Sequence, residues 1–124
     1  MTIRVATRAR RKELFEEAVA IITIEYSEEL TVDGVARRLF VSRRQLQRAF
    51  AEAGRGNFRG YLCRVRMQRA AELLARGWTV RETAAAVAYS QPAQFAKAFR
   101  RQYGHPPSAL RNGNVDGAGD PADD

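Results

Sequence analysis

The sequence predicts an all-α protein of about seven helices, with two helix-turn-helix subdomains bridged by a long linker helix. Three observations support this fold class. Apolar residues recur at helical spacing along most of the 124 residues, and no segment keeps the alternation of a strand. A pattern of short helix, tight turn and second helix occurs twice. One long periodic segment joins the two copies.

After the first helix, each predicted helix begins at a capping residue or a proline, and three of the seven end at a glycine. The first helix spans about 8–26, and its apolar surface comes from Leu14, Phe15, Ala18, Ile21, Ile22 and Ile24. The first helix-turn-helix spans about 31–53, the linker helix about 57–76 and the second helix-turn-helix about 79–103. The expected caps are Thr31, Ser42, Asn57, Thr79 and Pro92, and a last short turn reaches Arg111. Trp78 is expected to anchor the packing after the linker helix.

The charge of the chain suggests a polyanionic partner. The formal charge is +7, and the segment 113–124 carries four Asp and no basic residue. Without that segment, 21 basic and 10 acidic residues remain in 1–112, a formal charge of +11. Such a balance favours nucleic acid, or less often an anionic membrane surface. We expect residues 1–112 to form the domain and 113–124 to be a disordered acidic tail.

Other functional classes find little support in the composition. The longest apolar stretch near the start, residues 18–24, is far shorter than the roughly 20 residues that span a bilayer. The single Cys63 excludes an intrachain disulfide and fits a reducing cytoplasm. The single His105 lies in a turn, and no nucleophile, phosphate loop or carboxylate pair forms a catalytic set. We therefore expect no enzyme activity, no cofactor and no metal.

The two helix-turn-helix copies align over their apolar positions. The matched pairs are Ala36 with Ala84, Leu39 with Val87, Ser42 with Ser90, Leu46 with Phe95 and Phe50 with Phe99. The offset is 48 residues up to the serines and 49 after them, so the second turn has one extra residue. In such a motif the second helix enters the major groove of DNA.

The second helix of the first copy has an outward face suited to base edges. Arg44 and Arg48 lie opposite the apolar side formed by Leu46 and Phe50, and Gln47 flanks them. Arginine can make a forked pair with guanine, and glutamine can do so with adenine. The bland interpretation is a solvated basic face, but no acidic residue occurs between residues 41 and 51.

The corresponding helix of the second copy has a simpler outward face. Ala93 can touch a thymine methyl group, and Gln94 can pair with adenine. Lys97, Arg100 and Arg101 are better suited to phosphates, which position a protein without reading sequence. The first copy is therefore expected to supply most of the discrimination between DNA sequences.

Three motifs in order resemble the DNA-binding domain of the AraC/XylS family of bacterial transcription regulators. They are VARRLFVSRRQLQRAF (35–50), YLCRVRMQRAAELL (61–74) and TAAAVAYSQPAQFAKAFRRQYGHPPSALR (83–111). The resemblance implies two helix-turn-helix subdomains that enter successive major-groove segments, so that a monomer binds double-stranded DNA. It places base-reading residues at Arg44, Gln47, Arg48, Ala93, Gln94 and Lys97. We expect phosphate contacts from Thr31, Ser42, Arg43, Thr79, Arg81, Arg100 and Arg101.

The chain departs from the family pattern at three positions. Both turns usually contain glycine, whereas this chain has Phe40 and Ala88. A residue with a side chain must accept an unfavourable backbone conformation there or alter the turn. Ala93 replaces a residue that is commonly polar in the family. The chain resembles the small stand-alone members, although an excised C-terminal domain fits equally well.

The resulting function is that of a transcription regulator, expected to be an activator in the bacterial cytoplasm and nucleoid, with RNA polymerase as a possible partner. The alternative is a protein-interaction module that binds RNA polymerase or another regulator, with incidental DNA contact. The candidate surfaces for that module are the acidic clusters Glu13/Glu16/Glu17 and Glu25/Glu28/Glu29.

Overall fold

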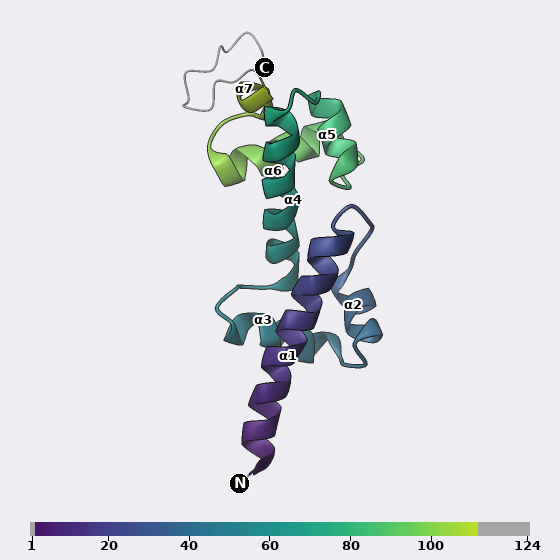
Figure 1. Ribbon diagram of the computed structural model, residues 1–124, viewed down its shortest axis with the longest axis vertical. Coiled ribbons are helices and arrows are strands. Elements are labelled where there is room, and N and C mark those ends of the chain that lie inside the picture. The colour runs from purple at the N-terminus through teal and green to yellow at the C-terminus, as the bar shows by residue number, and fades with distance from the viewer. Residues whose placement is uncertain (1, 112–124) are drawn as a thin grey trace. The chain divides into compact units, whose positions relative to one another are not determined.

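The computed structural model describes the backbone of residues 2–111 and the side chains of residues 8–110. The expected acidic tail, 113–124, lies outside the described residues. The described part of the chain has seven α-helices and no strand, as predicted (Figure 1). They are α1 (Thr2–Glu25), α2 (Val32–Arg38), α3 (Arg43–Glu52), α4 (Phe58–Ala75), α5 (Val80–Ala86), α6 (Pro92–Tyr103) and α7 (Pro107–Arg111).

The helix boundaries agree with the prediction except at the first helix, which begins at Thr2 instead of about Arg8. No glycine or proline interrupts residues 2–25, so the helix is free to continue toward the N-terminus. The chain divides into two compact units within α4, one up to Leu62 and the other from Cys63. Each unit contains one helix-turn-helix.

An aromatic cluster forms the centre of the first unit. Phe50 of α3 is fully buried and makes edge-to-face contacts with the rings of Phe15, Phe58 and Tyr61, at centroid distances of 5.1, 5.8 and 5.7 Å. The rest of this core is aliphatic and comprises Leu14, Ala18, Ile22, Val35, Ala36, Leu46, Ala49 and Leu62. Burial of such side chains contributes about 1.5–3 kcal/mol each for the larger ones. Phe50 therefore holds α3 against α1 and the start of α4.

Phe95 and Phe99 of α6 occupy the equivalent place in the second unit. Both are fully buried, and their rings lie 5.8 Å apart. Tyr89 packs on the edge of Phe95 at 5.8 Å. The buried neighbours are Met67, Ala70, Leu73, Leu74, Thr83, Ala84, Val87, Ala98 and Ala109. The hydroxyl of Thr83 donates to the carbonyl of Thr79 at 2.8 Å, so this buried polar group is satisfied.

Two apolar side chains expected to pack are exposed instead. Ile24 is 77% exposed because it lies opposite Ile22 on the helix, near the end of α1. Trp78 is 41% exposed, and its backbone N–H bonds to the carbonyl of Leu73 at the end of α4. The expectation that Trp78 is a packing anchor is therefore wrong.

Both helix-turn-helix turns have the same hydrogen-bond pattern. After α2, the N–H of Phe40 bonds to the carbonyl of Arg37 at 3.1 Å, and that of Val41 bonds to Ala36 at 3.0 Å. After α5, Ala88 bonds to Ala85 at 3.2 Å, and Tyr89 bonds to Ala84 at 2.8 Å. This pattern is the Schellman motif, which requires a left-handed residue just past the helix.

Phe40 and Ala88 supply the left-handed residue, with φ angles of 60° and 69°. The chain therefore keeps the turn geometry and accepts the backbone strain at both positions. The ring of Phe40 is 94% exposed, so the burial of the ring offsets almost none of the free energy lost to the left-handed backbone conformation. For a residue with a side chain that cost is about 1–2 kcal/mol.

An ion pair ties the two helices of the first motif together. Nε and Nη2 of Arg43, at the start of α3, donate to the two carboxylate oxygens of Asp33 in α2, at 2.8 and 2.6 Å. These hydrogen bonds hold the pKa of Asp33 below its usual value and raise the pKa of Arg43. The pair is exposed to solvent, so its contribution to stability depends on pH and salt.

The substitution Phe40→Gly is expected to raise the free energy of unfolding by about 1 kcal/mol, because relief of the strained φ exceeds the added entropy of the unfolded chain. Urea unfolding followed by circular dichroism measures it. Phe40→Ala is the matched control and should change the stability little, because Ala keeps the strain and the ring is exposed. Equal stabilisation by both variants would assign the effect to the ring and contradict the strain argument.

The Asp33–Arg43 pair should stabilise the first unit above the unfolded-state pKa of Asp33 and cease to do so as pH falls through its lower folded-state pKa. Asp33→Asn should therefore lower the melting temperature at pH 7, and the difference from the wild type should begin to narrow as pH falls below about 4. Thermal unfolding over pH 3–7 tests this. A difference that stays constant down to pH 3 would show that the carboxylate charge is not responsible.

Candidate nucleic-acid interface

The start of α3 is held by a reciprocal cap. The hydroxyl of Ser42 accepts a hydrogen bond from the backbone N–H of Gln45 at 3.1 Å, and the side-chain oxygen of Gln45 accepts from the N–H of Ser42 at 2.9 Å. This capping box satisfies two donors that a helix start otherwise leaves open. It commits the oxygen of Gln45 to the backbone and fixes the orientation of the first turn.

The outward face of α3 is the one predicted from its spacing. Leu46, Ala49 and Phe50 are buried, whereas Arg44 and Arg48 project into solvent. Within the described residues, Arg44 makes no hydrogen bond or ion pair. Nε of Arg48 lies 3.6 Å from the carboxylate of Glu52, too far for a strong hydrogen bond, and its side chain is 66% exposed. Both guanidinium groups therefore present donors to solvent.

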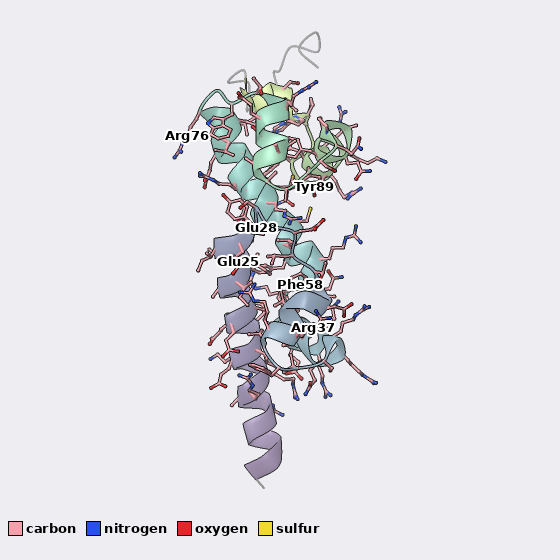
Figure 2. All side chains as sticks on the ribbon, turned by 90° about the vertical axis from the view of Figure 1, so that its right-hand side faces the viewer. Glu25, Glu28, Arg37, Phe58, Arg76 and Tyr89 are labelled. Atoms are coloured by element: carbon pink, nitrogen blue, oxygen red, sulfur yellow. The ribbon has the colours of Figure 1, made fainter. Side chains whose placement is uncertain are left out.

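Gln47 has a structural role that the sequence analysis missed. Its side-chain oxygen accepts a hydrogen bond from the backbone N–H of Phe58, the first residue of α4, at 3.1 Å. Phe58 is labelled in Figure 2, and Asn57 before it caps the same helix by accepting from the N–H of Gly60 at 2.7 Å. Gln47 thus connects α3 to the start of α4. Its amide N–H₂ group is the remaining donor.

The outward face of α6 also follows the prediction. Phe95, Ala98 and Phe99 are buried. The predicted contact residues Ala93, Gln94, Lys97, Arg100 and Arg101 are all exposed. The start of α6 differs from that of α3, because its cap residue Gln91 makes no side-chain hydrogen bond and Pro92 occupies the first position. The extra residue in this turn separates Ser90 from the cap position that Ser42 holds in the first copy.

The residues predicted to contact phosphate fall into two groups. The hydroxyls of Thr31, Ser42 and Thr79 each accept a backbone N–H at the start of a helix, at 3.0–3.1 Å. A hydroxyl that accepts a hydrogen bond keeps its own O–H free to donate to a phosphate. Arg43 is paired with Asp33, whereas Arg81, Arg100 and Arg101 are exposed side chains.

The acidic clusters in α1 and just after it are partly neutralised by arginines. Arg38 of α2 binds both carboxylate oxygens of Glu25 at 2.8 Å, and these hydrogen bonds lower the pKa of Glu25 (labelled in Figure 2). Arg10 lies 3.3 and 3.4 Å from carboxylate oxygens of Glu13 and Glu17. These pairings reduce the free negative charge that the protein-interaction alternative requires.

The described residues contain no group of three or more His, Cys, Asp or Glu side chains placed to hold a metal ion. In the same part of the chain, no helix combines the length and the apolar character needed to cross a membrane. His105 lies against the rings of Phe99 and Tyr103, at 5.7 and 6.2 Å, and has a packing role.

Comparisons of the sequence and of the fold with known proteins point to the same family. A family model described as a helix-turn-helix domain matches residues 35–113. The chain is 32% identical over 92 residues to the Msm operon regulatory protein of Streptococcus mutans, covering 73% of this chain and 33% of that protein. The chain spans a third or less of the length of the curated relatives that it matches.

Two solved structures share the fold. One is a transcriptional regulator from Chromobacterium violaceum, described as having an AraC-type DNA-binding domain. It is 25% identical, with a TM-score of 0.77 over 89% of this chain and 99% of that chain. The other is the C-terminal domain of AraT, a response regulator from Geobacillus stearothermophilus. It is 30% identical, with a TM-score of 0.77 over 81% of this chain and 84% of that domain. Together with the two helix-turn-helix motifs and their outward faces, these matches show that the chain belongs to the AraC family of transcription regulators and carries its helix-turn-helix DNA-binding domain.

Proposed function

We propose that the protein is a sequence-specific transcription activator that binds double-stranded DNA as a monomer, in the cytoplasm and nucleoid of a bacterium. The observation that carries this proposal is the outward face of α3, where Arg44 and Arg48 project into solvent directly opposite the buried Leu46 and Phe50. Because the buried side chains fix the rotation of α3, its guanidinium donors can face DNA without any rearrangement of the hydrophobic core. Arginine at such a face suits the two acceptors of guanine in the major groove.

The two recognition helices divide the work in this proposal. α3 supplies most of the base discrimination through Arg44, Gln47 and Arg48. In α6, Ala93 contacts a thymine methyl group and Gln94 hydrogen-bonds to adenine. Lys97 contacts the bases beside them. Helices of such motifs enter major-groove segments about 10 base pairs apart. The expected site is therefore asymmetric, with a richer block under α3.

The remaining contacts position the protein on the duplex. Phosphates are expected to bind Thr31, Ser42, Arg43, Thr79, Arg81, Arg100 and Arg101. Activation further requires a contact with RNA polymerase, for which the surfaces of either unit outside the DNA contacts are available. The domain responsible for all of these contacts is residues 1–112.

The chemistry available to Gln47 restricts what it can read. A forked pair with adenine needs both the amide oxygen and the amide N–H₂ of glutamine. The amide oxygen has two lone pairs, and one of them already accepts from the N–H of Phe58, whereas the N–H₂ group is the donor that remains for a base. Gln47 is therefore proposed to donate one hydrogen bond, to N7 of a purine or to O4 of thymine, instead of selecting adenine alone.

Selection of bound duplexes from a random DNA pool tests the proposal. The wild type should recover two blocks about 10 base pairs apart. Arg44→Ala together with Arg48→Ala should erase the preferences in the richer block, at about 1–3 kcal/mol for each lost bidentate contact, and leave the other block intact. Retention of the wild-type motif by the double variant would mean that α3 is not the reading helix.

Two substitutions at Gln47 should separate its roles. Gln47→Glu keeps an oxygen for the N–H of Phe58 but loses the N–H₂ donor, so stability should hold while the preference at one position of the richer block disappears. Gln47→Ala should lose that preference too and also cost about 1 kcal/mol of stability, as loss of a helix cap does. Unfolding curves and selected motifs give both readouts. Equal destabilisation by Glu and Ala would contradict the capping role.

A further inference from the structure

We propose that a hollow beside α3 binds one sugar–phosphate unit of the DNA strand that borders the groove segment read by this helix. This inference rests on the DNA-binding function proposed above and adds a contact outside the recognition face. The hollow has a volume of about 590 Å³ and lies between α1, α3 and the turn that precedes α3. It is lined by Arg10, Arg11, Leu14, Leu39, Phe40, Val41, Gln45 and Arg48.

The charged side of the hollow suits a phosphate. Three of the eight lining residues are arginines, and none of the eight is acidic. Arg10 and Arg48 keep side-chain exposures of 45% and 66%, and their nearest carboxylates lie 3.3–3.6 Å away. A guanidinium has five N–H donors, so such long single contacts leave most of them for another acceptor. Because Arg48 also belongs to the proposed recognition face, Arg10 is the arginine that we assign to the bound phosphate.

Arg11 has a different part in the hollow. Its side chain is only 15% exposed, and Nε lies 2.7 Å from a carboxylate oxygen of Glu52 in an ion pair without the alignment of a hydrogen bond. Arg11 therefore forms a fixed wall and adds positive potential, because a partly buried charge is screened less than an exposed one. The pair also ties α1 to α3 at the hollow.

The apolar side of the hollow suits a deoxyribose. Leu39, Phe40 and Val41 form this wall at the turn. Phe40 is 94% exposed although its φ of 60° is unfavourable, so the fold itself gains almost nothing from the ring. The turn requires the left-handed backbone at this position but not an aromatic ring, so the exposed ring is available for another contact. The sugar of a nucleotide presents apolar C–H groups to such a ring, and the phosphate beside it faces the arginines.

The position of the hollow explains why a backbone strand would pass there. Gln45 and Arg48 of its lining belong to α3 itself. The major groove is about 8.5 Å deep, and a helix with side chains is about 10–12 Å wide, so a seated helix keeps the groove-bordering phosphates alongside it. Figure 1 shows the N-terminal turns of α1 continuing past α3, and Arg10 of α1 belongs to the lining of the hollow.

A second hollow lies on α1 and α3, with a volume of about 540 Å³. Its lining shares Arg11 with the first hollow and adds Arg8, Lys12, Glu16 and Glu52. It therefore contains two carboxylates in its own lining, whereas the first hollow contains none. Lys12 is exposed and only two positions from Arg10, so it is a matched control for the loss of one positive charge.

The test uses the duplex recovered by selection, with a neutral methylphosphonate replacing one phosphate at a time along both strands at the richer block. For the wild type, one or two adjacent replacements beside α3 should weaken binding about tenfold, the effect of losing one hydrogen bond to a charged group. Arg10→Gln should weaken binding to the unmodified duplex by a similar factor and then be insensitive to those replacements. Its slope of log affinity against log salt should fall by about 0.9.

Three further variants make the test decisive. Arg10→Lys should restore the salt slope, and Lys12→Gln should stay as sensitive as the wild type to the same replacements. Phe40→Ala should weaken binding about threefold without changing the slope, because it removes an apolar contact and no charge. Melting curves confirm that each variant is folded.

The results that would overturn the proposal are distinct. If Arg10→Gln keeps the wild-type sensitivity at every phosphate, or if Lys12→Gln loses it equally, the hollow binds no particular phosphate. In that case the wild type still selects its motif, and the proposed function stands. If the wild type binds no duplex at all, the proposed function and the hollow fail together.

Discussion

The left-handed residue between the two helices of each motif is the constraint on which the rest of the structure depends. Only a left-handed residue lets the N–H groups after α2 and α5 bond back to the helix they end. The chain then reverses within a few residues, and the next helix starts with its apolar side toward the core. Phe40 and Ala88 meet this requirement at a cost, whereas Gly54 and Gly77 meet it freely at the ends of α3 and α4.

The buried face and the proposed recognition face lie on opposite sides of one helix in each unit. Phe50 and Phe99 are completely buried and fix the rotation of α3 and α6 about their axes. Because a helix rotates by 100° per residue, burying these positions determines which side chains reach solvent. The outward face is therefore a consequence of the core, and the exposed arginines that are proposed to read bases need no packing of their own.

Most polar side chains at the start of α3 make hydrogen bonds that fix the structure. Ser42 and Gln45 bond each other's backbone, Gln47 caps α4, and Arg43 is held by Asp33. These bonds fix the helix start and the angle to α2, while Arg44 keeps all of its donors. The second recognition helix has no such cap, which matches its simpler set of exposed side chains. This difference supports the proposal that the first copy supplies most of the base discrimination.

The sequence by itself determined the helices, their starts and the two outward faces, because capping and apolar spacing act within a few residues along the chain. It also indicated the family and the strained turns. Only the tertiary structure decided the partners of Gln47 and Arg43, and the exposure of Ile24, Trp78 and Phe40. Gln47 and Arg43 bond residues on other helices, and the exposed side chains depend on which neighbouring helices cover them. No local pattern encodes such contacts, since they arise only when separate helices are brought together by the core.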